Sequence, residues 1–205
     1  MTPRYWKQAT RELAARDAVL RKLTAKFNGL ALGSRGDAFA TLSRAIVGQQ
    51  ISVRAAQSVW DRLAAGLPAI TPAAIVEADS ERLRGCGLSG RKVIYLKDLA
   101  ARFHSGAIDV TTWAQLDDET LIDELTKVKG IGRWTAEMFL IFYMARPDVL
   151  PLDDLGLQRA MRLHYNHGRR LSLARMRRIG DTWAPWRSVA TWYLWRSLDP
   201  LPVEY

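Results

Sequence analysis

Two short stretches of the sequence carry residues whose types and spacing could do chemistry, and the first is a turn with Gly130 and Gly132 on either side of Ile131. Glycines can take positive φ and let a backbone approach a ligand closely. The turn leads straight into a helical stretch, whose first N–H groups attract anions. Because Lys129 and Arg133 add positive charge on both sides, the turn predicts a phosphate-binding site. The alternative is a simple helical hairpin with a glycine C-cap.

The second stretch is the acidic pair Asp153 and Asp154, about two dozen residues after the glycine turn and just before another helical segment. A carboxylate in this place can act as a general base or stabilise a developing positive charge. The positive end of the helix that begins at Leu155 would favour the ionised form. The simpler alternative is that both aspartates only cap that helix.

Helices must position both groups, because apolar residues recur at helical spacing along almost the whole chain and strand-like alternation is scarce. The sequence therefore predicts an all-α fold of about ten helices. The second helix of the hairpin, from Arg133 to about Ala145, is apolar on most faces and is expected to be a buried spine. Capping signals at Asp37, Ser52 and Thr71 predict the starts of three further helices. The other predicted helices cover residues 6–27, 80–84, 89–104, 118–128, 155–165, 172–183 and 186–198.

The composition indicates a globular protein with a polyanionic partner. The chain has 205 residues, 48% of them hydrophobic, which is enough for one domain or two lobes that share a core. Lys and Arg outnumber Asp and Glu by 30 to 21, although a basic protein without such a partner would look the same. The single cysteine, Cys86, excludes a disulfide framework within the chain. Since we find neither a signal peptide nor a long apolar run, we expect a cytoplasmic protein without a membrane span.

Five segments together carry a family resemblance: IVGQQISVRAA (residues 46–56), GLSGRKVIYLKDLA (87–100), VKGIGRWTAEMFL (128–140), LPLDDLGLQRA (150–160) and WAPWRSVATWYLW (183–195). They resemble the helix-hairpin-helix (HhH-GPD) DNA glycosylase superfamily and, within it, the AlkA-type 3-methyladenine DNA glycosylases (type II). The hairpin alone also occurs in non-catalytic DNA-binding proteins. The hairpin, the later aspartate and the GQQIS turn together are much more specific.

The resemblance implies a fold of two helical lobes with a cleft between them. Lobe one would comprise residues 1–36 and 134–205, and lobe two would comprise residues 37–133 and end in the hairpin. The whole chain, residues 1–205, would then be a single glycosylase domain. The stretch before residue 37 is too short for the N-terminal β-domain of AlkA, so we expect a compact version of the fold.

By the same resemblance, Asp154 is the catalytic residue. Cleavage of an N-glycosidic bond builds positive charge on the sugar, which a carboxylate near C1′ would stabilise while it orients or deprotonates the attacking water. Glycosylases that also nick the strand carry a nucleophilic lysine after the Gly-Arg of the hairpin, where this chain has Trp134. We therefore expect a monofunctional enzyme.

The base pocket implied by the resemblance contains Trp134, Trp195 and Met138. An indole face attracts a cationic alkylated purine, although Trp134 could instead be a packing residue. AlkA has a tyrosine where this chain has Met138. The other tryptophans near the end of the chain have ordinary core spacing.

The hairpin and the GQQIS turn are the implied DNA-contact regions. A base inside a duplex must be extruded before it is attacked, and in the family the residue in the place of Gln50 fills the gap. AlkA has a leucine there, so Ile51 could share this role, and the alternative is a polar turn that only joins two helices. The residues implied to contact DNA are Lys129, Gly130, Ile131, Gly132, Arg133, Thr135, Gln49, Gln50, Ile51 and Ser52.

The sequence predicts no cofactor and no catalytic metal, because the three histidines have no convincing ligand spacing. As in the family, the carbonyl groups of Gly130–Gly132 could hold a cation that bridges to a phosphate. A basic run, Arg169, Arg170, Arg175, Arg177 and Arg178, is either a solvated face or a phosphate track.

The predicted function is that of a monomeric DNA glycosylase that flips alkylated purines such as 3-methyladenine and 7-methylguanine out of double-stranded DNA and hydrolyses their glycosidic bond. Two alternatives stay open. One is a non-catalytic helix-hairpin-helix DNA-binding module, and the other is a bifunctional glycosylase and abasic-site lyase.

Overall fold

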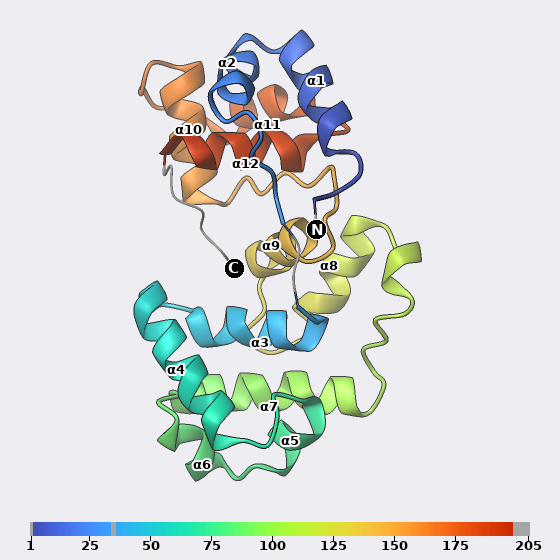
Figure 1. Cartoon of the computed structure of the whole chain (residues 1–205), viewed down its shortest axis with the longest axis vertical. Helices are drawn as coiled ribbons and strands as arrows, with labels where there is room; N and C mark the ends of the chain where they lie inside the picture. The colour runs from blue at the N-terminus through green and yellow to red at the C-terminus, as the bar shows by residue number, and fades with distance from the viewer. Residues whose placement is uncertain (1, 34–35, 199–205) are drawn as a thin grey trace. The chain divides into compact units, whose positions relative to one another are not determined.

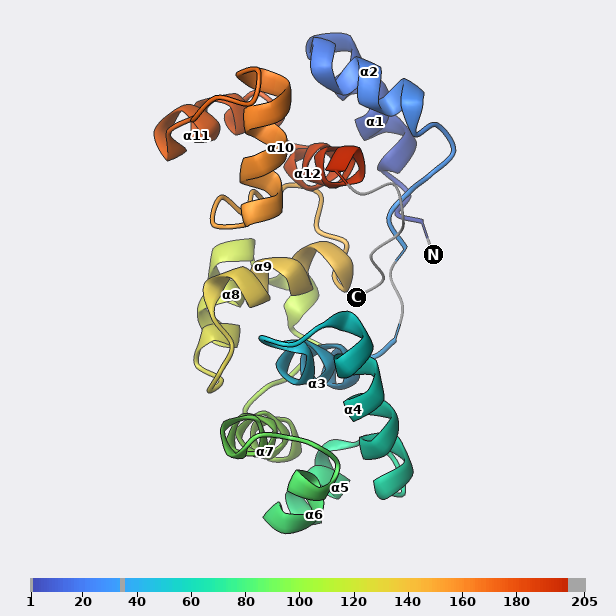
Figure 2. The same cartoon turned by 90° about the vertical axis from the view of Figure 1, so that its left-hand side faces the viewer.

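The computed structural model describes residues 2–33 and 36–198, and within them the fold is all-α, as predicted (Figures 1 and 2). No helix in these ranges is long and apolar enough to cross a bilayer. The described elements are α1 (Trp6–Arg16), α2 (Ala18–Lys26), α3 (Ala38–Gly48), α4 (Val53–Gly66), α5 (Pro72–Glu77), α6 (Ser80–Gly85), α7 (Gly90–His104), the 3-10 helix η1 (Trp113–Gln115), α8 (Asp118–Thr126), α9 (Arg133–Phe142), α10 (Leu155–Tyr165), α11 (Leu173–Asp181) and α12 (Arg187–Leu198).

The helices form two compact units. The described part of unit 1 comprises residues 2–33 and 140–198, and unit 2 comprises residues 36–139. The division falls inside α9, between Phe139 and Leu140. The expected lobe boundary, between residues 133 and 134, lies at the start of the same helix. The catalytic candidate Asp154 therefore belongs to unit 1, whereas the glycine turn belongs to unit 2.

Unit 1 is built around α12, which packs against α1, α2 and α10. Residues 188–194 are buried without interruption, so this helix has no solvent-facing side along that stretch. The rings of Trp6 and Trp192 meet edge to face with centroids 5.2 Å apart, and Trp183 is fully buried. As expected, most of the C-terminal tryptophans are packing residues.

Unit 2 is built around α7, which packs against α3, α5 and α6 (Figure 2). A row of four aromatic rings runs through it, each meeting the next edge to face. Centroid distances are 5.3 Å from Phe39 to Phe103, 6.3 Å from Phe103 to Trp113 and 5.4 Å from Trp113 to Phe139. This row links α3 and α7 to the part of α9 that follows the glycine turn, and residues 135–141 of α9 are all buried, as predicted.

Two element boundaries differ from the sequence prediction, each for a local reason. Residues 6–27 form two helices, because Asp17 is extended and its carboxylate caps α2 through Val19 N and Leu20 N. The helix α9 ends at Phe142, earlier than expected. Ala145 is left-handed with φ 51°, and Arg146 N donates to Leu140 O at 2.9 Å, so the chain turns back on the last turn of the helix. The described residues thus contain twelve α-helices where about ten were expected.

Candidate functional site

The carboxylate of Asp154 is held at the start of α10 by two N–H donors. Its Oδ1 accepts a hydrogen bond from Leu157 N at 2.6 Å, which is the N-cap bond of the helix. The same oxygen accepts a second bond from the indole Nε1 of Trp195 at 2.7 Å. A side chain at Gly156 would be tightly packed against this pair, since a Cβ there would lie 3.0 Å from Asp154 Oδ1 and 3.3 Å from Trp195 Cδ1. The carboxylate is thus fixed by backbone, indole and steric contacts at once.

Trp195 therefore has a contact that the sequence did not indicate. It was expected only as an aromatic wall, and its ring does stack on Phe142 with centroids 5.6 Å apart and planes 12° from parallel. Its N–H group, however, is directed at Asp154, which lies 41 residues earlier in the chain. Such a hydrogen bond makes Trp195 a positioning residue for the carboxylate. The neighbouring Asp153 is exposed and is not part of this arrangement.

The loop that leads to Asp154 is anchored to the start of α12. The guanidinium of Arg187 forms two bonds to the carboxylate of Asp148, at 2.8 Å and 2.9 Å. Ser188 Oγ accepts a bond from Val149 N at 2.9 Å, and Ser188 N donates to Pro147 O at 3.0 Å. The helix α12 thus carries both the anchor of the loop and, two turns later, the indole that holds Asp154.

The glycine turn is shaped by a close contact with α7. Gly130 has φ 83°, and a Cβ at this position would lie 2.2 Å from Cδ2 of Tyr95. Gly132, in contrast, does not have a positive φ, and no atom lies within 4 Å of the place that a Cβ would take there. Only one of the two glycines is therefore needed for the shape of the turn. Ile131, between the two glycines, is 4% exposed, so its side chain is buried in the interior.

A carboxylate on α7 fixes the other side of the turn. Lys129 N donates to Asp98 Oδ2 at 3.0 Å, and Arg102 Nε donates to the same oxygen at 3.1 Å. Burial alone would raise the pKa of Asp98, but these two hydrogen bonds and the positive charges of Arg102 and Lys129 together keep the pKa below its ordinary value. Asp98 was not predicted as a site residue. Its spacing from Tyr95 puts both on one face of α7, which is at most a weak signal.

Arg133, the predicted phosphate contact after the turn, is engaged by two carboxylates instead. Its Nη1 and Nη2 donate to Glu119 at 2.8 Å and 2.6 Å, and its Nε donates to Glu137 at 3.0 Å. The bonds to Glu119 contribute most to raising the pKa of Arg133 above its ordinary value. This arrangement favours a role in joining α8 to α9 over a role as a free cation for phosphate.

The GQQIS turn between α3 and α4 is tied to the glycine turn. The side-chain amide of Gln49 donates from Nε2 to Gly130 O at 2.7 Å, and Lys92 Nζ donates to Val47 O at 2.7 Å. Directly after these anchors, Gln50 has φ 59°, a left-handed conformation that costs a residue with a Cβ roughly 1 kcal/mol. Ser52 caps α4 as predicted. The turn is therefore held in a strained conformation by hydrogen bonds to residues 45 and 81 positions away in sequence.

The tip of this turn presents apolar side chains next to the strained residue. Gln50 is exposed, Ile51 is 40% exposed and Val53 is 77% exposed. Exposed apolar residues at a turn are suited to insertion between stacked bases. The side chains of Gln50, Ile51 and Val53 are thus all exposed to solvent at one turn.

The remaining predicted residues lie on α9. Trp134 is 40% exposed, whereas Thr135 and Met138 are buried at 8% and 7% exposure. Their roles in a base pocket or in DNA contact stay predictions. Among the residues that the structure describes, no group of three or more His, Cys, Asp or Glu side chains is arranged to hold a metal ion.

A comparison with known families decides how this arrangement is interpreted. The family model of the HhH-GPD superfamily base excision DNA repair proteins matches residues 43–185, which is more than half of the chain. The chain belongs to the HhH-GPD superfamily. The match includes the GQQIS turn, the glycine turn and Asp154, but Trp195 lies beyond it.

Individual members of the superfamily are similar over longer stretches. DNA-3-methyladenine glycosylase 1 of Schizosaccharomyces pombe is 38% identical over 162 residues, which cover 76% of this chain and 70% of the relative. A crystal structure of a Bacillus halodurans DNA-3-methyladenine glycosidase is 32% identical and superposes with a TM-score of 0.86, covering 93% of this chain and 89% of that one. The S. pombe 3-methyladenine DNA glycosylase in complex with abasic DNA, also 32% identical, has a TM-score of 0.78, with 97% and 99% covered.

Proposed function

We propose that this HhH-GPD protein is a monofunctional DNA glycosylase that removes alkylated purines from DNA and so starts base excision repair. Water adds to C1′ of the nucleotide as the bond from C1′ to the purine nitrogen breaks. The base leaves with the electron pair of that bond, and an abasic sugar remains. A purine alkylated at N3 or N7 carries a positive charge in DNA, so it departs as a neutral base and needs little help from a general acid.

The held carboxylate of Asp154 is the observation that carries this proposal. Positive charge builds on the sugar as the base departs, and a preorganised carboxylate stabilises that charge without reorganisation during the reaction. Leu157 N and Trp195 Nε1 both bind Oδ1, which fixes the direction in which the carboxylate points. The carboxylate can also accept a proton from the attacking water.

A monofunctional mechanism is favoured by the residue after Gly132-Arg133. A glycosylase that also cleaves the strand needs an amine at this place to form a Schiff base with C1′. Here Trp134 occupies it, and its 40% exposed indole can instead receive a cationic base. Similarity to proteins named 3-methyladenine glycosylases supports the same substrate class.

The turns of unit 2 would contact the DNA itself. Backbone N–H groups that follow Gly132 would bind a phosphate, and because Gly132 has no side chain and no near neighbour, the phosphate can approach closely. The exposed tip at Gln50 and Ile51 would fill the gap left by the extruded nucleotide. The S. pombe relative bound to abasic DNA supports DNA as the partner.

The carbonyl oxygens of Gly130 and Gly132 are suitable ligands for a cation at the hairpin. Gly130 O accepts a bond from Gln49 Nε2, and Gly132 O accepts one from Ala136 N at 3.0 Å. A carbonyl oxygen has two lone pairs, so each could still face a cation. Such a cation, when bound, would neutralise the phosphate that these carbonyl groups would otherwise repel.

The direct test is to incubate the purified protein with methylated duplex DNA and to identify released bases by mass spectrometry. We expect free 3-methyladenine or 7-methylguanine, intact strands with abasic sites, and no covalent adduct after borohydride treatment. Binding without base release would favour the non-catalytic DNA-binding alternative. A trapped adduct would favour the lyase.

The indole N–H of Trp195 gives a second prediction. Trp195→Phe keeps the ring on Phe142 but removes the donor to Asp154, so we expect single-turnover base release to slow by about tenfold, or roughly 1.4 kcal/mol. Phe142→Leu, which removes the stacking partner and keeps the donor, is the matched control and should slow release less. If Trp195 acted only as a wall, Trp195→Phe would release bases at the wild-type rate.

A further inference from the structure

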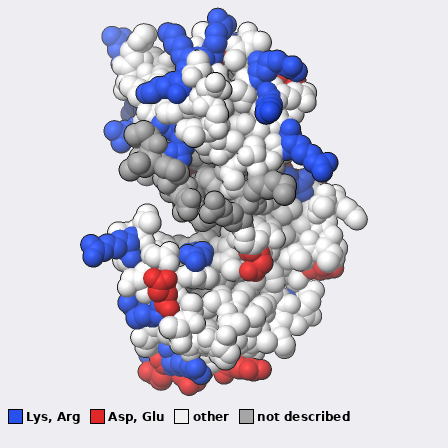
Figure 3. Space-filling model, in the orientation of Figure 1, with Lys and Arg blue, Asp and Glu red and all other residues white. Residues whose placement is uncertain are grey.

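The positive charge of the chain is concentrated in unit 1. Its described residues, 2–33 and 140–198, contain 17 Lys and Arg against 6 Asp and Glu, a net charge of +11. Unit 2, residues 36–139, contains 12 against 13, a net charge of −1. On the visible face in Figure 3, unit 1 accordingly shows many basic and few acidic side chains. The unit that carries the glycine turn therefore contributes almost no net attraction to a polyanion.

Five arginines of unit 1 are clustered within one stretch of the sequence, residues 169–178. All five are exposed, and none forms an ion pair with another described residue. Several other arginines of the chain, such as Arg102, Arg133 and Arg187, are paired with carboxylates. We call this set the arginine surface, and it consists of Arg169, Arg170, Arg175, Arg177 and Arg178.

Three of the five arginines, Arg175, Arg177 and Arg178, lie on α11, which packs against the loop that ends at Asp154. In α11, Met176 and Gly180 are buried, and a Cβ at Gly180 would lie 2.5 Å from Cδ2 of Leu150. Leu150 belongs to the loop that ends at Asp154. Because α11 turns its apolar side toward this loop, its arginines face outward, and any anion they bind is held in a fixed relation to Asp154.

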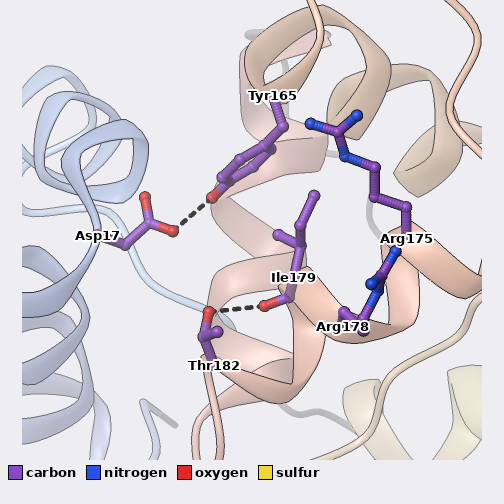
Figure 4. Close-up of a pocket in the computed structure, with 6 residues that line it drawn as sticks. All are labelled: Asp17, Tyr165, Arg175, Arg178, Ile179 and Thr182. Carbon is purple, nitrogen blue, oxygen red and sulfur yellow. Dashed lines mark hydrogen bonds between the residues drawn. The ribbon is translucent and has the colours of Figure 1, made fainter.

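Two of these arginines line a hollow beside α11 and form no ion pair with the carboxylate on its other side. It has a volume of about 420 Å³, and Arg175 and Arg178 lie on one side of it, opposite Asp17 (Figure 4). Asp17 does not pair with them, because its carboxylate is already satisfied. Its Oδ2 accepts bonds from Tyr165 Oη at 2.8 Å and Trp183 Nε1 at 3.2 Å.

Hydrogen bonds on both of its oxygens hold the Asp17 carboxylate in this position. Asp17 Oδ1 caps α2, so the carboxylate is used on both oxygens. Burial, and then the negative charge of Asp17, raise the pKa of Tyr165, so its hydroxyl remains a donor to that carboxylate. The hollow therefore has a positive side that forms no ion pair with the carboxylate across it.

We propose that the arginine surface binds the phosphate backbone of duplex DNA and supplies most of the salt-dependent, sequence-independent affinity of the protein. The inference rests on the proposed function and adds a second contact region to the hairpin. Planar guanidinium groups match phosphate oxygens in pairs, and exposed arginines without carboxylate partners can bind them without first breaking an ion pair. The nearly neutral unit 2 would then position the lesion, while unit 1 retains the protein on DNA.

The test compares two double variants that each remove two positive charges from unit 1. Arg175→Gln/Arg178→Gln alters the arginine surface, and Lys7→Gln/Arg11→Gln alters exposed residues of α1. Affinity for undamaged duplex DNA is measured over a range of salt concentrations. For the first variant we expect the slope of log affinity against log salt to decrease by about 2, and the affinity near 0.1 M salt to fall roughly tenfold or more. The α1 variant should keep most of the wild-type slope.

Base release separates this inference from the proposed function. At saturating enzyme, the Arg175→Gln/Arg178→Gln variant should release alkylated bases within about twofold of the wild-type rate, since it leaves Asp154 intact. An unchanged salt slope, or an equal loss in the α1 variant, would overturn the arginine surface as a specific contact region. If wild-type protein binds DNA but releases no base, the proposed function fails, while the salt slopes still decide this inference.

Discussion

The Asp154→Asn variant is expected to bind duplex DNA that contains alkylated purines normally and to release bases about 10³-fold more slowly than the wild type. The substitution removes the negative charge and the proton acceptor but little else. Asparagine is as good an N-cap as aspartate, and its side-chain oxygen can still accept from Leu157 N and Trp195 Nε1. The slower base release would therefore measure how much the negative charge of the carboxylate contributes to the reaction. Single-turnover base release and equilibrium binding measure the two effects separately.

The neighbouring aspartate provides the matched control for charge. Asp153→Asn removes the same charge one residue away, at an exposed position that does not cap α10. We expect it to release bases at close to the wild-type rate. Equal losses in both variants would mean that only the local electrostatic field matters, and wild-type release by Asp154→Asn would contradict the assignment of the catalytic residue.

Much of the fold can be predicted because helix starts are coded locally. Asp37, Ser52 and Thr71 are predicted capping residues, and each accepts a bond from a backbone N–H three residues later. The break at Asp17 obeys the same rule. The sequence prediction misses it because apolar residues recur through it at helical spacing, and periodicity alone does not show where a cap interrupts a helix.

The contacts that shape the site could not be predicted in this way, because they join residues distant in sequence. Trp195 and Asp154 are 41 residues apart, and Gln49 and Gly130 are 81 residues apart. No periodicity carries that information. The left-handed Gln50 gives no local signal either, since glycine is the usual residue at such a φ. The motif indicates which residues matter, whereas the structure shows how they are held.

The net charge of the chain predicts the kind of partner but not which surface binds it. An excess of 9 positive charges indicates a polyanionic partner, and the glycine turn was the predicted site for it. The structure separates these two observations, because the turn lies in the unit without net positive charge. Arg133 was expected to bind phosphate on the basis of its position, but Glu119 and Glu137 neutralise it. Ion pairs between helices are invisible in a composition, and they decide which charges remain available.

Gly130→Ala is expected to be the most damaging single substitution in the glycine turn. Two effects add, since alanine disfavours φ 83° and its Cβ would lie 2.2 Å from Tyr95 Cδ2. Left-handed strain costs about 1–2 kcal/mol and overpacking about 1–3 kcal/mol, so we expect the free energy of unfolding to fall by about 2–5 kcal/mol. Displacement of the turn would also disturb the bond from Gln49. Denaturant unfolding measures the first effect, and binding to duplex DNA at a temperature where the variant is folded measures the second.

Gly132→Ala separates the shape of the turn from its contact with DNA. Gly132 needs no positive φ, and no atom lies within 4 Å of the place its Cβ would take, so alanine should leave the free energy of unfolding within about 0.5 kcal/mol of the wild type. If a phosphate approaches the backbone here, the added methyl group should nevertheless weaken DNA binding. Destabilisation by Gly132→Ala as large as that by Gly130→Ala would contradict the distinct roles of the two glycines. Unchanged DNA binding would show that the phosphate does not approach the turn at Gly132.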